Sequence, residues 1–409
     1  MMQMLARLCA TLCAAAGLIA APSVASAASY TLFDLGMLGA PGEWHRMTAT
    51  GLNSSGQVVG YASFFSADAQ GQPIEATQAW VTGANGIGLS TIPTLGGTWN
   101  RANGINDAGW VVGSSLTANG SERAFAAGPN GASPHDLGTL GGSSSAAAGI
   151  NASGQVVGTS TTAAGVQRGF ISDAQAGSLH DLGSLYAGAT ATSSATAIND
   201  AGQVTGTAIA AHPLDGTERA FVTGPNGSAM RPVTVPTANG DVPNWGTDIN
   251  ASGQTVGTTS AFYYYQTGFI AEADGSGRLL QLPEIPQGTE PPFHFLDSRA
   301  TALNSAGQVV GFYHLGTLAE GLFVTGPDGV GGNYLGFEDF VGGTLPVFFN
   351  EARAINDAGQ IIANAGNGHA YLISPVPEPA AVLMMACGLC WLAARRAPSG
   401  PRRLVKENS

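Results

Sequence analysis

One short motif recurs along the whole chain and limits what the chain can fold into. In residues 147–160 it reads Ala-Ala-Gly-Ile-Asn-Ala-Ser-Gly-Gln-Val-Val-Gly-Thr-Ser. Its asparagine recurs, with spacings of 45 to 54 residues, at Asn53, Asn106, Asn151, Asn199, Asn250, Asn304 and Asn356. A fixed period of this length indicates a repeat architecture, so the fold follows from one repeat and the way in which seven copies stack.

The composition favours short strands joined by glycine-rich turns. Charged residues make up 10% of the chain, and it contains 59 glycines. A helical protein needs more Glu, Lys and Leu, and a disordered protein would lack the recurring Ile, Val and Phe. Both classes are therefore disfavoured.

Each repeat reads as four antiparallel strands. In the third repeat we expect strands at 147–151, 155–159, 168–172 and 180–185. The first two are joined by the turn Asn-Ala-Ser-Gly, in which glycine supplies the positive φ that reverses the chain. The adjacent valines Val156 and Val157 would point to opposite faces, so both faces of the sheet should be covered.

Seven such units predict an all-β, seven-bladed β-propeller over residues 28–375, with the small-residue first strands innermost. The ends of the array favour a closed ring over an open solenoid. Residues 30–36 resemble a fourth strand that has no preceding partners, whereas the last repeat stops after its third strand at Ile373. The N-terminal strand would complete the last blade and leave no open edge.

Residues 1–27 have the pattern of a secretory signal peptide. A lone Arg7 precedes an apolar run, and the small residues Ala25 and Ala27 suit signal peptidase, with cleavage after Ala27. This predicts a helical signal peptide and an exported body.

Residues 376–409 predict a membrane-associated end. Pro377-Glu378-Pro379 is followed by an uncharged segment, 380–394, and then by Arg395-Arg396. The segment is short for a helix that spans a membrane, which needs about 20 residues, and the basic flank would stay in the cytoplasm. This order resembles the PEP-CTERM sorting signal of Gram-negative bacteria that produce exopolysaccharide. The resemblance implies a helix in the inner membrane and recognition and cleavage by an exosortase; an ordinary C-terminal anchor predicts the same orientation.

The repeats themselves resemble the bacterial extracellular HAF-repeat family over roughly residues 30–375. The match is carried by Asp-Leu-Gly-Thr-Leu-Gly-Gly at 136–142, Gly-Ile-Asn at 149–151, Gly-Gln-Val-Val-Gly at 154–158 and Arg-Gly-Phe at 168–170. The resemblance implies an exported, repetitive surface or secreted body. The family has no known catalytic residues that could be assigned to positions in this sequence.

Charge and cysteine positions exclude several classes of site. All four cysteines lie in the two end segments, at Cys9, Cys13, Cys387 and Cys390, so the body would have no disulfide, thiolate metal site or thiol nucleophile. Between residues 28 and 376, nine arginines and no lysine oppose twenty-five Asp and Glu, a net charge of −16. Such a surface repels nucleic acid.

No catalytic, metal-binding or cofactor-binding motif is found, so we expect no cofactor, no metal and no enzymatic activity. His135 and His180 precede Asp-Leu-Gly in equivalent repeats and would lie on separate blades, whereas zinc needs three or four converging ligands. The Asn-Asp-Ala-Gly turns offer one carboxylate each, and Ca²⁺ needs about 6–8 oxygens. Both features read better as structural.

The candidate ligand-binding residues lie on the face that carries the second-to-third loops and the links between blades. The segments that vary most are found there: 62–78, 208–218, 260–266 and 286–298. Variation gathered on one face of a scaffold is typical of binding sites. Two of these segments bring aromatic residues that would stack on sugar rings: Phe262, Tyr263, Tyr264, Tyr265, Phe293, His294 and Phe295. The alternative is that these aromatics pack inward or extend strands.

Three functions remain open. The first is a non-enzymatic exported protein that binds or organises exopolysaccharide or another envelope component. The second is a propeller-type polysaccharide hydrolase or lyase, which would need two carboxylates about 5–10 Å apart. Its acids would come from the loop face: Glu43, Glu75, Asp215, Asp241, Glu290 and Asp297. The third is a structural matrix protein without a specific ligand.

Overall fold

The computed structural model describes residues 30–39, 44–67, 73–211, 218–237, 240, 242–262, 265–282, 297–315, 319–336, 339–341 and 348–376. Thr31–Ser374 forms one compact unit, and Met1–Tyr30 with Pro375–Ser409 forms another. Within the described ranges, no helix is long and apolar enough to cross a membrane. The signal peptide and the helix at 380–394 lie outside those ranges, so they and the domain boundaries stay predictions.

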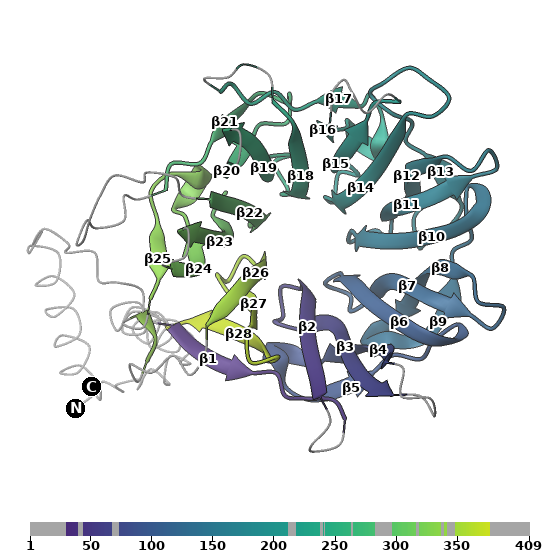
Figure 1. Ribbon diagram of the computed structural model, residues 1–409, viewed down its shortest axis with the longest axis horizontal. Coiled ribbons are helices and arrows are strands. Elements are labelled where there is room, and N and C mark those ends of the chain that lie inside the picture. The colour runs from purple at the N-terminus through teal and green to yellow at the C-terminus, as the bar shows by residue number, and fades with distance from the viewer. Residues whose placement is uncertain are drawn as a thin grey trace, which may run out of the picture. The chain divides into compact units, whose positions relative to one another are not determined.

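The larger unit is a seven-bladed β-propeller of four-stranded antiparallel sheets, as predicted. Figure 1 shows the sheets in a ring, with β2, β6, β10, β14, β18, β22 and β26 nearest its centre. The first four blades are β2 (Trp44–Leu52), β3 (Val58–Ala67), β4 (Pro73–Thr82), β5 (Leu89–Thr91); β6 (Gly96–Ile105), β7 (Val111–Thr117), β8 (Glu122–Gly128), β9 (Ala132–Asp136); β10 (Gly141–Ile150), β11 (Val156–Thr162), β12 (Gln167–Ser172), β13 (Leu179–Asp181); and β14 (Thr192–Ile198), β15 (Val204–Ile209), β16 (Glu218–Val222), β17 (Arg231–Pro232).

The remaining blades are β18 (Asn244–Ile249), β19 (Thr255–Phe262), β20 (Tyr265–Ala271), β21 (Gly277–Leu279); β22 (Asp297–Leu303), β23 (Val309–Leu315), β24 (Ala319–Val324), β25 (Asn333–Leu335); and β26 (Phe349–Ile355), β27 (Ile361–Ala365), β28 (Ala370–Pro375) with β1 (Tyr30–Asp34). Short 3₁₀ turns lie between third and fourth strands: η2 (Ala84–Gly86), η3 (Pro129–Gly131), η5 (Pro225–Gly227) and η6 (Pro327–Gly329).

The N-terminal strand closes the ring, which confirms the prediction made from the two ends of the array. The seventh sheet has the order β1-β28-β27-β26. Thr31 Oγ1 donates to the Ser374 carbonyl at 3.2 Å, and Leu35 N donates to the Ala370 carbonyl at 3.0 Å. Strands from opposite ends of the chain therefore share one blade.

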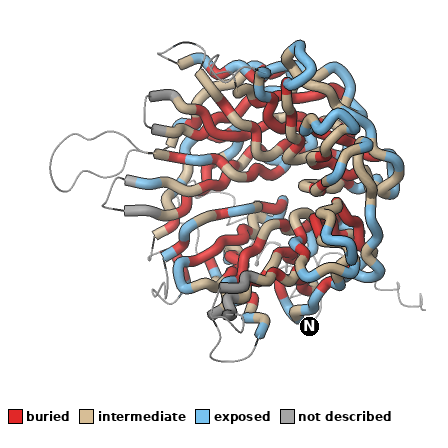
Figure 2. The backbone as a smooth tube through the Cα atoms, turned by 45° about the vertical axis from the view of Figure 1, so that its right-hand side comes forward, coloured by how far each residue is buried: buried red, intermediate tan, exposed pale blue. Residues whose placement is uncertain are grey.

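The hydrophobic core lies between successive blades. Val156 packs in one cluster with Phe170, whereas Val157 packs with Phe221 of the next blade in another. Both faces of the sheet are thus covered, as the paired valines predicted. The aromatic residue of the third strand is buried in every blade, and Figure 2 shows buried residues along the strands and exposed residues at the turns. These aromatics are Trp80, Phe125, Phe170, Phe221, Phe269, Phe323 and Tyr371.

Glycine in the second strand lets the two inner strands approach closely. A Cβ on Gly158 would lie 2.1 Å from the Ala146 carbonyl oxygen, far inside van der Waals contact. The same closeness recurs at Gly60, Gly113, Gly206, Gly257 and Gly311. The seventh blade has Ala363 at this position, paired with Ala352.

The repeated asparagine joins neighbouring blades and also forms a turn. Asn151 Oδ1 accepts from Gln155 N at 2.9 Å, which fixes the turn between β10 and β11. Its Nδ2 donates to the carbonyl of Asn199 in the next blade at 3.1 Å. Equivalent bonds run from every repeat to the next and form a closed ring of seven buried asparagines.

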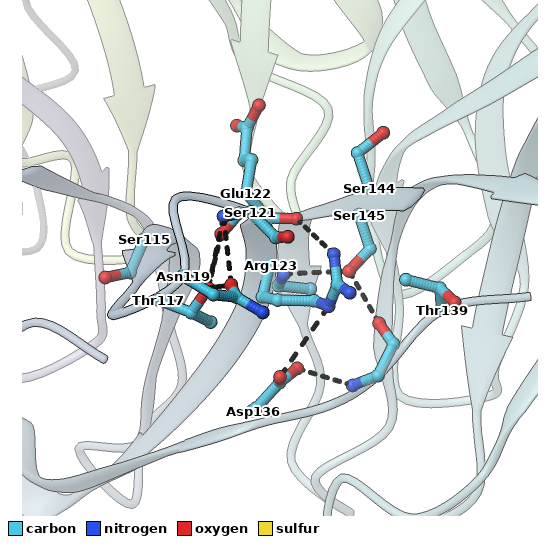
Figure 3. A network of polar contacts seen from close by, with 12 residues as sticks. Ser115, Thr117, Asn119, Ser121, Glu122, Arg123, Asp136, Thr139, Ser144 and Ser145 are labelled. Atoms are coloured by element: carbon cyan, nitrogen blue, oxygen red, sulfur yellow. Dashed lines mark hydrogen bonds and ion pairs between the residues drawn. The ribbon is translucent and has the colours of Figure 1, made fainter. Parts of the chain in front are cut away.

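A second polar contact joins blades near their middle, and Figure 3 shows it between the second and third blades. The Arg123 guanidinium bonds the Ser143 carbonyl and lies 3.7 Å from the Asp136 carboxylate. Ser145 Oγ accepts from Ala124 N at 2.9 Å and donates to the Gly138 carbonyl at 2.6 Å. Side chains therefore satisfy buried backbone groups where two sheets meet.

Strand lengths differ from the prediction in two respects. The first strand of the third repeat begins at Gly141, six residues earlier than expected, because its first half pairs with an extended β11. The fourth strand ends at Asp181, because Asp181 Oδ1 accepts from Gly183 N at 2.7 Å and Gly183 has a positive φ of 76°. That turn directs 182–185 into the link to the next blade.

Candidate binding site in the central channel

The innermost strands enclose a cavity of about 420 Å³ at the centre of the ring. Each blade contributes residues from the last three positions before its asparagine. The lining residues are Thr50, Gly51, Leu52, Asn103, Gly104, Ile105, Ala148, Gly149, Ile150, Thr196, Ala197, Ile198, Thr247, Asp248, Thr301, Ala302, Arg353, Ala354 and Ile355. The cavity is therefore a central channel built from the repeat motif itself.

The first of these three positions lies in a β-bulge, and in several blades its side chain bonds the next blade. The pairing of each first strand shifts by one residue there, for example between Ala49 and Gly51, which leaves Thr50 unpaired. The freed Thr50 side chain donates to the Ala102 carbonyl of the next blade at 2.8 Å. Thr196 and Thr247 make the same bond, and Asn103 makes it through its amide.

The seventh blade replaces this threonine with Arg353. Arg353 Nε lies 2.9 Å from Glu351 Oε2, and 44% of the arginine side chain is exposed. Within the described ranges no other partner of the guanidinium is found. The substitution places a positive charge at the wall of the channel.

The fifth blade replaces a small residue with Asp248 at the second position. The other blades have glycine or alanine there, and a Cβ on Gly104 would already lie 3.1 Å from the Ala148 carbonyl oxygen. Asp248 reaches the next blade: its Oδ2 accepts from Leu303 N at 3.1 Å and its Oδ1 accepts from Ile249 N at 2.9 Å. Burial raises the pKa of Asp248 to about 6, although both hydrogen bonds oppose that shift.

Sequence reasoning missed Arg353 and Asp248. Both residues lie in the repeat motif, just before its asparagine, and we interpreted every copy of that motif as structural. The signal that would have found them is the departure from the repeat pattern. Asp248 replaces the glycine or alanine of the other blades, and Arg353 replaces an uncharged Thr, Asn or Ala.

Arginines and aromatic rings lie at one end of the channel. The guanidinium of Arg101 lies 5.0 Å from the ring centre of Tyr61 and 5.6 Å from that of Trp99. Arg299 lies 5.6 Å from the ring centre of Phe312. Arg101 and Arg299 are exposed. Each lies two residues before the first channel-lining residue of its strand, Asn103 or Thr301, on the side toward the second-to-third loops.

Trp245 occupies the position in the fifth blade that Arg101 and Arg299 occupy in theirs. Its indole Nε1 donates to the carboxylate of Glu218 in the preceding blade. We refer to Tyr61, Trp99, Arg101, Trp245, Arg299 and Phe312 as the mouth residues.

The predicted aromatic loops fall mostly outside the described residues. Phe262 is the last residue of β19 and Tyr265 the first of β20, and the two pair with each other at the end of that hairpin. The backbone of these two therefore extends strands, which is one of the alternatives we considered. Tyr263, Tyr264, Phe293, His294 and Phe295 lie outside the described ranges, as do Ala25, Ala27, Pro377, Glu378, Pro379, Arg395 and Arg396.

The loop face is also less irregular than predicted in the first blade. Segment 62–78 is largely strand, because β3 and β4 remain paired as far as Ala67 and Pro73.

The acids proposed for a hydrolase do not meet in the part of the chain that is described. Asp297 Oδ1 accepts from Gln266 N at 3.1 Å and so joins two blades. Glu75 lies in β4, and the other four candidates, Glu43, Asp215, Asp241 and Glu290, lie outside the described ranges. Among described residues, Asp248 is the one carboxylate that lines the channel.

The turn aspartates have structural partners. Asp107 Oδ1 accepts from Ser54 N at 2.9 Å, and Asp200 and Asp357 make the same bond to the preceding blade. His180 Nε2 lies 2.9 Å from Asp173 Oδ1. Among the described residues, no group of three or more His, Cys, Asp or Glu is placed to hold a metal ion.

Comparisons with known proteins yield fold-level similarities only. No family model and no curated protein matches the chain. Among solved structures, YCF48 bound to the D1 peptide is 12% identical with a TM-score of 0.47, covering 86% of this chain and 100% of that one. Virginiamycin B lyase from Staphylococcus aureus is 11% identical with a TM-score of 0.43, covering 85% and 100%. An acylaminoacyl peptidase from Pyrococcus horikoshii is 8% identical with a TM-score of 0.49, covering 84% and 54%. Enzymes are thus among the similar structures, but similarity this distant does not bear on function.

Proposed function

We propose that this protein is an exported, non-enzymatic propeller that binds or organises exopolysaccharide, or another envelope component, on the face that carries the mouth residues. The observation that carries the proposal is the pairing of exposed arginines with aromatic rings around one end of the channel. Aromatic faces stack on sugar rings, and a guanidinium bonds hydroxyl or carboxylate oxygens with several donors in one plane.

The charge distribution supports a polyanionic ligand at this place. The body carries a net charge of −16, yet four of its nine arginines lie on innermost strands: Arg46, Arg101, Arg299 and Arg353. The innermost strands also carry Asp248, Asp297 and Glu351, so their net charge is +1, against −17 for the rest of the body. This difference favours binding of an anion at the centre of the ring over binding elsewhere on the body. An acidic polysaccharide combines that charge with rings that stack.

Export follows from the predicted end segments. Signal peptidase would cleave after Ala27, and the C-terminal segment would hold the protein in the inner membrane until an exosortase acts. After processing, we place the protein at the cell surface or outside the cell.

The rival functions have less support. A hydrolase or lyase would need a second carboxylate beside Asp248, and Glu351, the other described acid near this wall, is already paired with Arg353. A purely structural protein gives no reason for exposed arginine and aromatic pairs at the channel mouth.

The proposal is tested by binding of recombinant residues 28–376, which include every strand and the closing pair, to exopolysaccharide from the producing bacterium. A mouth variant with Trp99→Ala, Arg101→Ala and Arg299→Ala is compared with Arg231→Ala, a charge change on the outer strand β17. Circular dichroism and thermal unfolding verify the fold of each variant.

We expect saturable binding that the mouth variant loses by about tenfold or more and Arg231→Ala retains. A second variant, with Tyr263, Tyr264, Tyr265, Phe293 and Phe295 changed to Ala, tests the aromatic loops. Absence of binding by folded protein would overturn the proposal, and shortening of the polysaccharide during the assay would favour the hydrolase or lyase.

A further inference from the structure

We propose that the central channel is a binding site for one acidic sugar residue, a uronate, whose carboxylate pairs with Arg353 and whose hydroxyls bond the threonine-lined wall. This inference deepens the proposed function and rests on it in one respect: the uronate would be supplied by the end of a polysaccharide chain that lies across the mouth.

The size and lining of the channel fit a small polar ligand. Its volume of about 420 Å³ lies in the lower part of the range for small-molecule sites, roughly 300–1,000 Å³. Threonines of four blades line the wall, and their hydroxyl hydrogens are already used on backbone carbonyls. Their oxygens are left as acceptors, which suits the hydroxyl donors of a sugar.

Arg353 selects the charge of the ligand. It is the one cation among the described residues that line the channel, and Glu351 engages its Nε. The two terminal amines of the guanidinium remain as a fork of donors, which matches the two oxygens of a carboxylate. A neutral sugar would leave these two terminal amines with no anionic partner besides Glu351, which contacts Nε.

Asp248 makes the binding depend on pH. Its carboxylate lies on β18, faces Leu303 of β22, and shares the cavity with Arg353 of β26. The other charged residues described on these strands are Asp297 and Arg299 near the start of β22 and Glu351 on β26. Because Asp248 titrates near pH 6, its negative charge repels a bound uronate above that pH and is lost below it. Affinity for a uronate should therefore rise as the pH falls from 7.5 to 5.

The repeat itself supplies variants that should fold. Arg353→Thr restores the residue of Thr50, Thr196, Thr247 and Thr301, and Asp248→Ala restores that of Ala197, Ala302 and Ala354. Each change replaces a charged side chain with one that the same position already accommodates in other blades. Arg231→Ala, on the outer strand β17 and outside the cavity lining, is the matched control.

The experiment measures binding of galacturonate, glucuronate, trigalacturonate and galactose by isothermal titration calorimetry at pH 5 and 7.5. We expect galactose to bind at least about tenfold more weakly than galacturonate, and Arg353→Thr to lose about tenfold or more for the uronates alone. Arg231→Ala should keep the affinity for all of these sugars. Asp248→Ala should remove the difference between the two pH values.

Equal binding of galactose and galacturonate, or uronate binding unchanged in folded Arg353→Thr, would overturn the inference. Its failure is distinguishable from failure of the proposed function. If exopolysaccharide binding needs the mouth residues but not Arg353, the channel site is wrong and the mouth stands. If the uronates bind through Arg353 while no polysaccharide binds, the channel stands and the proposed function is wrong.

Discussion

The amide of Asn356 donates to the backbone carbonyl of Asn53 at 3.1 Å, although 303 residues separate them. This bond is the last of a series in which every repeat asparagine bonds the carbonyl of the next, and it closes that series into a ring. The same residue type thus forms the turn within a blade and the contact between blades. One residue per repeat can therefore set both the local reversal and the ring.

The asparagine ring should contribute strongly to stability. Asn151→Ala removes the bonds to Gln155 N and to the Asn199 carbonyl and leaves both groups without their partner. We expect a loss of about 2–4 kcal/mol in the free energy of unfolding, measured by urea denaturation. Asn119→Ala, in an exposed turn, is the control and should lose less than about 1 kcal/mol. Equal losses in the two variants would contradict the role of the ring.

Glycine in the second strand should be required by space and not by its backbone angle. Gly158→Ala places a Cβ 2.1 Å from the Ala146 carbonyl oxygen, so we expect a loss of about 3–5 kcal/mol. Gly165 has a positive φ of 78° but no atom within 4 Å of its added Cβ, so Gly165→Ala should lose only about 1–2 kcal/mol. Thermal unfolding measures the stability of both variants. A larger loss in Gly165→Ala than in Gly158→Ala would refute the role of space.

The residue that follows the closing strand should help to hold the ring through its buried side chain. Leu35 is 4% exposed and packs in a cluster with Trp80 of the first blade and Leu372 of the last. Leu35→Ala should lose about 2–4 kcal/mol, because the cavity that it leaves lies where the ring closes. Phe33, two residues earlier in β1, is 44% exposed, and Phe33→Ala should change stability by only about 0.5 kcal/mol. Chemical denaturation measures both losses. Equal unfolding free energies of the two variants would show that the buried Leu35 side chain is not needed to close the ring.

Asp248 should destabilise the folded protein at neutral pH. Its pKa in the folded protein, about 6, lies above the ordinary value of 3.8, so the folded state binds the proton more tightly than the unfolded state. Stability should fall as the pH rises through this window, and Asp248→Ala should remove up to about 3 kcal/mol of that loss at pH 7.5. At pH 3.5 or below, the variant and the parent protein should differ little through this effect.

Asp274 is the control for that pH dependence, because its contribution to stability should change with pH in the opposite direction. Hydrogen bonds from Ser276 lower the pKa of exposed Asp274, so its contribution is present at neutral pH and is lost in acid. Denaturation curves at a series of pH values separate the two carboxylates. An advantage of Asp248→Ala that persists unchanged at pH 3.5 would show that burial of the charge is not its cause.

The sequence alone determined the fold, because its determinants are local and repeated. Asn-x-x-Gly-Gln marks each turn, the paired valines mark a strand covered on both faces, and the spacing sets the size of the blade. The two ends of the array also predicted closure, since residues 30–36 formed a fourth strand without a blade and the last repeat lacked a fourth strand.

Only the tertiary structure decided which residues meet at the axis. Arg353 and Asp248 are 105 residues apart and belong to different blades, so no local pattern brings them together. They share a cavity because seven first strands converge on it. The same applies to the asparagine ring: its turn geometry follows from neighbours in the chain, whereas its bonds between blades exist only when the ring is closed. Local hydrogen bonds and periodicity can be read along a chain, but the environment of a charge depends on segments that only folding brings near it.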